Sequence, residues 1–474
     1  MCCKKTTLNQ FCNLITKFNL KISILYATNK ILLTLNREEE LKNFSKKIAV
    51  AAIPAVMALS APQAESKILL MSQEGWEVSF DGAANAFLMK QSSTATGDIL
   101  TGANGVTTFE TAGGAVITQG TDGIGVVTGL LPNVWGMNLK APTANGLDVT
   151  ARIGFYTHMQ GNQEAFGNGL INLRETNFSV AGSFGTVTIG RSIGIAHQNA
   201  ILNDMLLFGV GAITGGADQS NTSLGRIGLG YLYTDFHPQI SYASPAFGPL
   251  SFKVGIFDPS DVVSSGTATS SGAASLSSPD ATEGDTPRVE ASINATIPVG
   301  DATVALWVDG SYQYAEFASG AGPGQGVSGD ALEGVESADV AFGTKLSYQG
   351  FALVASGFKA HGVGTRGRHG AGALDIAGKA KHSYGGYLQG TYDFGQGTNI
   401  GYSYGGNYSL QNGADLGTTA VAETNGQTLH SGMLWHNVTD NFRVIAEGGY
   451  TEHSFHMGGA LDDTFGGVGA FFFW

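Results

Sequence analysis

The sequence predicts an all-β fold, a 16-stranded antiparallel transmembrane β-barrel with short periplasmic turns and long extracellular loops. Three observations lead to this prediction. Apolar and polar residues alternate along many segments, and tight turns alternate with long polar loops. No apolar run after Ala64 reaches the roughly 20 residues that a membrane-spanning helix needs.

The first 64 residues are expected to lie outside this fold. Lys46 and Lys47 precede an uncharged run at 48–61, and small residues at 62–64 end at Ala64, a pattern that indicates a signal peptide at 41–64. Residues 1–40 are expected to be a non-structural N-terminal extension. We hypothesise that translation begins at Leu41, and a codon there other than TTG or CTG would end that hypothesis. The barrel is assigned to residues 65–474.

Cysteine usage and charge exclude several classes of function. Cys2, Cys3 and Cys12 all precede the expected cleavage site, so the mature chain has no disulfide, thiol ligand or thiol nucleophile. Removing residues 1–64 takes away nine of the 25 basic and three of the 38 acidic residues, which leaves a net charge of −19. A chain this acidic is not expected to bind nucleic acid.

Two segments show the alternation clearly. In 302–314, Val304, Leu306 and Val308 share one face, and Asp309 and Gln313 share the other. In 288–297 the odd-numbered positions are apolar and the even-numbered positions are polar. A soluble β-sandwich would bury the apolar face, whereas a barrel would turn it to lipid and enclose water with the polar face. The alternation alone leaves both folds open.

The connections between the expected strands favour the barrel. Tight turns are expected at 143–146, 183–185, 248–249, 299–301, 349–350, 395–397 and 437–441, and long loops at 90–128, 160–173, 192–235, 258–286, 317–337, 361–381, 411–426 and, shorter, 455–461. Seven turns join 14 strands, and a first strand at 75–89 and a last one at 462–474 bring the number to 16. Short turns on one side and long loops on the other are typical of outer-membrane barrels.

Aromatic residues support a membrane location. The last strand ends on Phe472, Phe473 and Trp474, and such an apolar strand edge would be an aggregation hazard in water. Other aromatic residues lie beside the tight turns, where an interfacial girdle is expected. They are Phe184, Phe247, Tyr348, Phe351, Phe394 and Phe442.

The segment 174–191, RETNFSVAGSFGTVTIGR, resembles the hairpin that precedes the third loop of the Gram-negative general porin family. The segment 240–250 and the C-terminus add to this resemblance. The resemblance implies a homotrimeric outer-membrane porin whose third loop, here 192–235, folds into the lumen. It also implies that lipopolysaccharide surrounds the barrel and that the barrel-assembly machinery recognises the C-terminus through Phe472 and Trp474.

The resemblance further implies a constriction, where charges on the wall face charges on the third loop. The candidates are Arg152, Arg174 and Arg191 on the wall, Asp204 and Asp218 on the loop, and Asp235 before the next strand. Such charges would produce a transverse field that orients polar solutes, and the alternative is that they are merely solvated in a wide lumen. Arg174 shares the parity of Phe178 and Val180, so a β-bulge would be needed to turn it inward.

Other charged residues are expected to line the lumen because they lie opposite the apolar stripe. They are Asp148, Lys253, Arg288, Glu290, Asp309, Lys345, Arg443 and Glu447. The third loop also contains an apolar run at 205–210, and Asp235 and His237 stand where family members often carry an arginine. These departures predict a more acidic or more apolar constriction, and together with the net charge they predict modest cation selectivity.

The loop 361–381 is basic in an otherwise acidic protein, and it contains Arg366, Arg368 and His369. Two interpretations are open. These residues pair with the acidic loop 258–286, or they capture anions or lipopolysaccharide phosphates at the extracellular mouth.

No motif indicates an enzyme, a metal site or a cofactor. Gly362, Gly364 and Gly367 match a dinucleotide fingerprint, but no helix pattern follows them. His453 and His456 have no third ligand nearby in sequence. The sequence therefore predicts a channel for passive diffusion of small hydrophilic solutes and ions. A solute-specific channel, and a surface adhesin or structural barrel without conductance, are the alternatives.

Overall fold

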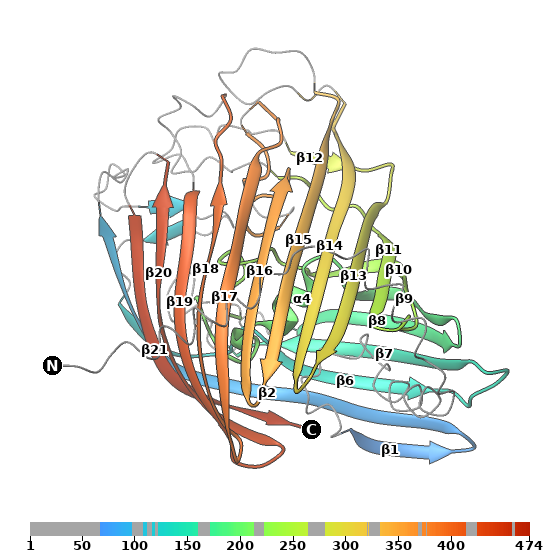
Figure 1. Cartoon of the computed structure of the whole chain (residues 1–474). Coiled ribbons are helices and arrows are strands. Elements are labelled where there is room, and N and C mark those ends of the chain that lie inside the picture. Colours follow the sequence, from blue (N-terminus) through green and yellow to red (C-terminus); the bar gives the residue numbers. More distant parts are fainter. Residues whose placement is uncertain are drawn as a thin grey trace, which may run out of the picture. The chain divides into compact units, whose positions relative to one another are not determined.

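The computed structural model describes residues 67–96, 108–110, 116–118, 122–159, 171–212, 222–263, 280–319, 321, 332–367, 372–375, 377–413, 424–456 and 460–474. These residues all fall within the unit Leu59–Trp474. Antiparallel strands make up most of them (Figure 1). A short helix, α4 (Gln198–Asn203), and a 3-10 turn, η1 (Met205–Phe208), lie between two strands. In these ranges no helix has the length and hydropathy needed to cross a membrane.

Sixteen strands close into a barrel, because β2 pairs with β21 along one edge and with β5 and β6 along the other. The strands are β2 (Trp76–Thr96), β5 (Gly123–Val127) together with β6 (Asn133–Lys140), β7 (Asp148–Thr157), β8 (Ile171–Gly182), β9 (Gly185–Ile193), β10 (Phe236–Ala243), β11 (Leu250–Phe257), β13 (Arg288–Val299), β14 (Ala302–Phe317), β15 (Gly334–Tyr348), β16 (Phe351–His361), β17 (His382–Gly395), β18 (Thr398–Ser409), β19 (Thr424–Asn437), β20 (Phe442–Phe455) and β21 (Ala460–Phe473). The expected number of strands is confirmed.

Four short strands supplement this wall. β1 (Ile68–Gln73) pairs with β2 at residues 76–80, before the pairing of β2 with β21 begins at Ala83. β12 (Ala281–Glu283) pairs with the loop-side end of β14. β3 (Thr108–Glu110) and β4 (Val116–Thr118) pair only with each other among the described strands.

Two of the tight turns contain two consecutive residues with positive φ angles. Asn145 and Gly146 have φ angles of 53° and 74°, and Gln349 and Gly350 have φ angles of 46° and 81°. This combination is typical of type I′ turns, whose twist matches that of antiparallel strands. These turns join β6 to β7 and β15 to β16 at the expected positions.

The burial of the strands decides between the barrel and the sandwich. On β14, Leu306 and Val308 are 42% and 51% exposed, whereas Asp309 and Gln313 are 3% and 0% exposed. A sandwich would show the opposite arrangement, with apolar residues inside and polar residues outside. The six aromatic residues beside the tight turns are also exposed on the outer surface, as a membrane-interface girdle requires.

The C-terminus closes the barrel against β2. Trp474 and Gly82 exchange two backbone hydrogen bonds, with N···O distances of 2.9 and 3.1 Å. The Trp474 ring packs 4.8 Å from the Trp135 ring and 5.7 Å from the Phe80 ring, centroid to centroid. A Cβ atom on Gly82 would lie 2.1 Å from the Val134 carbonyl oxygen, so only glycine fits at this closure.

Candidate pore constriction

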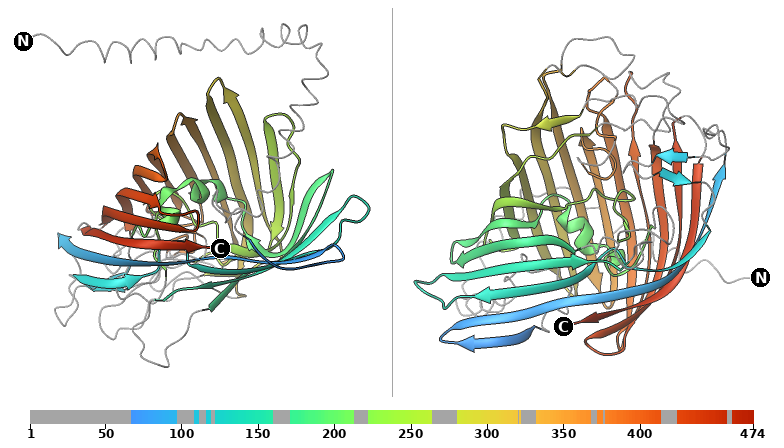
Figure 2. Two further views of the ribbon diagram at one scale, coloured as in Figure 1. Left: turned by 90° about the horizontal axis from the view of Figure 1, so that it is seen from below. Right: turned by 180° about the vertical axis from the view of Figure 1, so that it is seen from behind.

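The connection between β9 and β10 enters the lumen, as expected for a third loop. Its described parts are residues 194–212 and 222–235, and Figure 2 shows α4 inside the curve of the sheet. Lys253 on β11 donates a hydrogen bond of 2.5 Å to the side chain of Gln198 in α4. The Gln389 side chain on β17 accepts a hydrogen bond of 2.7 Å from the Met205 backbone. Side chains from distant strands therefore fix the path of this loop.

Three wall carboxylates hold the third loop by accepting hydrogen bonds from its backbone N–H groups. The contacts are Glu290 with Ile195 (2.7 Å) and Ala196 (2.9 Å), Asp309 with His197 (2.8 Å), and Glu447 with Val210 (2.7 Å) and Gly211 (2.8 Å). Hydrogen bonds to ionised groups are about twice as strong as neutral ones. These three carboxylates thus point towards the third loop, and their oxygens are engaged by its backbone.

His197 connects the first part of the loop to two more strands. Its φ angle of 62° lies in the left-handed region, which residues other than glycine rarely adopt. Its Nε2 atom lies 3.1 Å from Asp339 on β15, and its ring meets Phe358 on β16 edge to face at 5.5 Å. Burial lowers the pKa of His197, but Asp339, Asp309 and Glu290 raise it, and the net shift is upward. The raised pKa favours the imidazolium form that pairs with Asp339.

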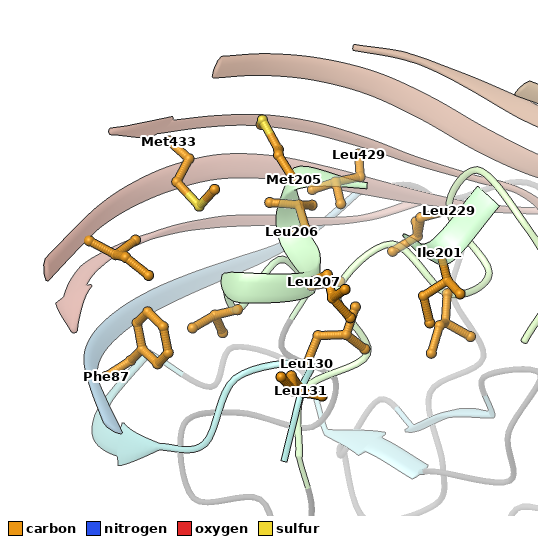
Figure 3. Packing of buried hydrophobic residues seen from close by; sticks show 14 of the residues in the cluster. Phe87, Leu130, Leu131, Ile201, Met205, Leu206, Leu207, Leu229, Leu429 and Met433 are labelled. Carbon is orange, nitrogen blue, oxygen red and sulfur yellow. The ribbon is translucent and has the colours of Figure 1, made fainter. Parts of the chain in front are cut away.

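The apolar run 205–210 packs against the wall. Figure 3 shows Met205 and Leu206 close to Leu429 of β19, and Leu207 close to Leu130. Leu206 and Leu429 are each 0% exposed. The expectation that this run would make the constriction more apolar is corrected here, because its side chains face the barrel wall and not the water.

Asp204 does not face a wall arginine across water, which corrects the expectation for this residue. Its carboxylate lies 3.6 Å from Nε of Arg226, with both side chains 0% exposed, and it accepts a hydrogen bond of 2.9 Å from the Tyr231 hydroxyl. Arg226 also donates to Ser403 on β18. Burial raises the pKa of Asp204, and Arg226 opposes this shift. The pair is a buried salt bridge that joins the first described part of the third loop, residues 194–212, to the second, residues 222–235.

Arg152 on β7 lies between two acidic residues. Its Nε is 2.8 Å from Glu175 on β8, and its Nη1 is 2.8 Å from Asp81 on β2. Nη1 also donates to Asn138 at 2.9 Å. Its side chain remains 19% exposed, so this cluster reaches the water of the lumen with two negative charges around one positive charge.

Arg174 turns inward through a β-bulge, which it needs because regular alternation would place it on the apolar face with Phe178 and Val180. The pairing of β7 with β8 shifts register between Gly154 and Phe155, whose partners are Glu175 and Leu173, so Arg174 has no partner on β7. The Arg174 guanidinium lies 5.1 Å from the centre of the Tyr156 ring. The bulge thus places Arg174 and Glu175 on the same side of the wall.

Tyr233 lies among three of the candidate constriction charges, at the return of the third loop to β10. Nη1 of Arg174 donates to the Tyr233 hydroxyl at 3.3 Å, and Nε2 of His237 lies 3.9 Å from Asp235. Burial raises the pKa of Tyr233 to about 12, with Asp235 adding to the shift and Arg174 and Arg191 opposing it. The structure therefore brings Arg174, Arg191 and Asp235 together, and their role in permeation stays a prediction.

The remaining lumen candidates make mainly structural contacts. Asp148 accepts a hydrogen bond from Thr143 across a tight turn, and Arg288 lies 3.0 Å from Glu290. Arg443 donates a hydrogen bond of 2.7 Å to Asn437 and lies 5.1 Å from the centre of the Phe208 ring. Lys345 is half-buried on β15. In the part of the chain that the structure describes, no three metal-ligating side chains gather at one place.

Arg366 lies against the third loop and not at the extracellular mouth, which corrects the expectation for this residue. Its backbone carbonyl accepts a hydrogen bond of 2.8 Å from the Tyr233 backbone, and its side chain fills the space beside Gly228. Arg368, His369 and Asp218 lie outside the described residues.

Asp81, Glu175, Arg226 and Tyr233 belong to the site but were not singled out from the sequence. Parity could not find Asp81, because the same inward face of β2 carries the apolar Phe87 and Met89, which are buried under the third loop. Glu175 lies on the same face of the strand as the polar Asn177 and Ser179, so the alternation itself was the available signal.

The comparisons with known proteins agree with this geometry. The family model of the Gram-negative porins matches residues 49–454. The chain belongs to the Gram-negative porin family. It is thus a multi-pass protein of the Gram-negative outer membrane, and its family and fold are those of channels.

Two solved structures show the same fold. The outer membrane channel DcaP of Acinetobacter baumannii has 14% identity and a TM-score of 0.56, over 85% of this chain and 99% of that chain. An anion-selective porin from Comamonas acidovorans has 13% identity and a TM-score of 0.51, over 84% of this chain and 100% of that chain. A search of curated proteins finds no match. At these identities the structures show the fold alone.

Proposed function

We propose that this porin forms a water-filled channel through which small hydrophilic solutes and ions diffuse passively, and that it catalyses no reaction. The supporting observation is the polar inner face of the barrel, across which the third loop is held by Glu290, Asp309 and Glu447. Single-channel recording in planar bilayers tests this function. A folded protein that never conducts would instead be a surface adhesin or a structural barrel.

We further propose modest cation selectivity. The expected net charge of the mature chain, −19, favours cations throughout the lumen. Near the constriction the charges are almost balanced, because Asp81, Glu175 and Asp235 accompany Arg152, Arg174 and Arg191. This balance supports a weak preference and not strict exclusion of anions.

Exchange of Glu175 for glutamine is expected to shift the selectivity towards chloride. The exchange leaves Arg152 with one acidic partner, and a unit charge at 4 Å contributes about 1 kcal/mol in water, so the permeability ratio should change by up to about fivefold. The measurement is the reversal potential in a KCl gradient. Glu336→Gln is the matched control, because Glu336 is exposed on β15. Chloride preference in the unmodified protein would contradict the proposed selectivity.

We propose a homotrimer in contact with lipopolysaccharide, with the wall formed by β2 and β5 to β9 at the interface between protomers. Exposed apolar side chains on this wall, such as Trp135, Met137 and Ile171, give it an outer surface that a neighbouring protomer can bury in place of lipid. The barrel-assembly machinery is proposed to recognise Phe472 and Trp474. The mass and the lipid phosphate content of the detergent-extracted particle test the assembly, and a purely monomeric particle would contradict it.

The mature protein is expected to begin at Glu65, after removal of residues 1–64. β1 begins at Ile68, so this cleavage would leave the whole described barrel intact. N-terminal sequencing of protein extracted from the outer membrane checks this expectation. A mature chain that retains any part of 41–64 would contradict the signal-peptide assignment.

A further inference from the structure

Two histidines face each other at the end of the barrel wall that carries the long loops. His361 is the last residue of β16 and His382 is the first residue of β17, and these strands lie side by side in Figure 1. The two histidines are direct partners in the pairing of the strands. Gly362 donates a backbone hydrogen bond of 2.8 Å to Lys381, so the adjacent pair of histidines is of the non-hydrogen-bonded kind, whose side chains lie closest together.

Both imidazole rings belong to the outer face of the wall. On β16, Phe351 and Leu353 share the parity of His361 and are exposed, whereas Val354 and Phe358 have the opposite parity and are buried. His382 is itself exposed. β16 and β17 do not belong to the wall proposed for the interface between protomers, so the proposed assembly leaves the histidine pair accessible.

The distance between the two rings fits a shared metal ion. Their centres are 4.5 Å apart, and their planes are inclined by 39°. Two imidazoles that share one ion through bonds of about 2.0–2.1 Å have ring centres roughly 4.5–5 Å apart. Within the part of the chain that the structure describes, neither ring forms a hydrogen bond. Nδ1 of His361 is covered by other atoms, which leaves Nε2 as the nitrogen of this ring that can bind an ion.

The neighbouring charges are compatible with a bound cation. Glu336 is exposed on β15 and lies within electrostatic reach of His361. It is two residues from Ala338, the partner of His361 on β15, and therefore lies on the same outer face. Lys359 shares this face, but its long exposed side chain can turn the ammonium group into water. Imidazole nitrogen suits Zn²⁺, Cu²⁺ and Ni²⁺, whereas Mg²⁺ and Ca²⁺ prefer oxygen ligands.

We propose that His361 and His382 together bind one divalent transition-metal ion of the Zn²⁺ type, with water in the remaining coordination positions. The site has two protein ligands, so it is smaller than the three-ligand groups that are absent from the described residues. Structural zinc sites have four protein ligands, and the ion bound here is therefore exchangeable. It cross-links the loop-side ends of β16 and β17 on the outside of the barrel. This inference goes beyond the proposed channel function and does not depend on it.

Isothermal calorimetry with ZnCl₂ tests the site on detergent-solubilised protein without a histidine tag. An excess of Mg²⁺ in the buffer occupies carboxylates and any lipid phosphates that would otherwise bind Zn²⁺. We expect one Zn²⁺ per chain to bind under these conditions. His382→Gln and His361→Gln should each weaken the binding by at least about tenfold, since even the loss of an outer partner of a metal ligand costs about 10–100-fold.

His430→Gln is the matched control, because His430 on β19 packs its ring 4.4 Å from the Tyr404 ring and not against a second histidine. This exchange should leave Zn²⁺ binding unchanged. The heat-induced shift in gel mobility verifies that each variant is folded. Three results would overturn the site: no binding of Zn²⁺ in excess Mg²⁺, equally tight binding by the folded variants at 361 and 382, or an equal loss of binding in the control.

Discussion

Replacing Arg226 by methionine is expected to lower the free energy of unfolding by about 3–5 kcal/mol and to make the open-channel current noisy. The exchange removes the only described ionic partner of Asp204 and leaves its carboxylate buried, with both side chains 0% exposed in the intact pair. It also removes the hydrogen bond to Ser403, which connects the returning part of the third loop to β18. The two described parts of the third loop, residues 194–212 and 222–235, should then separate from each other and from the barrel wall.

The heat-induced shift in gel mobility reports the stability of the barrel, and current noise in planar bilayers reports loop motion. The double variant Asp204→Asn with Arg226→Met is the matched control, because it removes both charges and avoids a buried unpaired carboxylate. It should recover part of the lost stability. An unchanged melting midpoint and a quiet current in the single variant would show that the ionic link does not hold the loop.

Shortening Leu206 to alanine is expected to have the second largest effect. Leu206 is 0% exposed at the centre of the apolar contact between η1 and the wall, and Figure 3 shows its neighbours on β19. Exchanges of buried leucine for alanine cost about 2–5 kcal/mol, because they remove apolar contacts and leave a cavity. Since the contact joins the loop to the wall, this cost should appear as loop detachment as well as lower thermal stability.

Leu306→Ala is the matched control for this exchange. Leu306 is 42% exposed on the lipid-facing side of β14, so its shortening leaves the loop contact intact. Both variants are compared by melting midpoint and by the variance of the single-channel current. Equal behaviour of the two variants would mean that the apolar contact of η1 does not fix the loop.

The sequence predicted the barrel well because strand patterns are local. The parity of Leu306 and Val308 against Asp309 and Gln313 predicts which side chains are buried, since successive side chains of a strand point to opposite faces. The connection lengths then identified lipid as the environment of the apolar face. Even the bulge at Arg174 followed from parity, because an arginine on the apolar stripe conflicts with the neighbouring residues.

The candidate site was harder to predict because its partners are distant in sequence. Parity placed Glu290 and Asp309 in the lumen, but the loop groups that they bind are 94 to 112 residues away. Asp204 was assigned to the water because Arg226, its partner, arrives only with the return of the same loop. Phe87 and Met89 broke the polar pattern of the inner face, because the loop covers them.

By itself the sequence determined the number of strands and which face of each strand meets lipid, since these depend on residues that are neighbours along the chain. That the long loop enters the lumen followed from the family resemblance of the hairpin 174–191. Only the tertiary structure decided which charged side chains of the lumen meet water and which form hydrogen bonds with the backbone of the third loop. The physical reason is that a lumen-facing carboxylate can be stabilised either by water or by hydrogen-bond donors of the loop. Which of the two surrounds it depends on how the loop crosses the barrel.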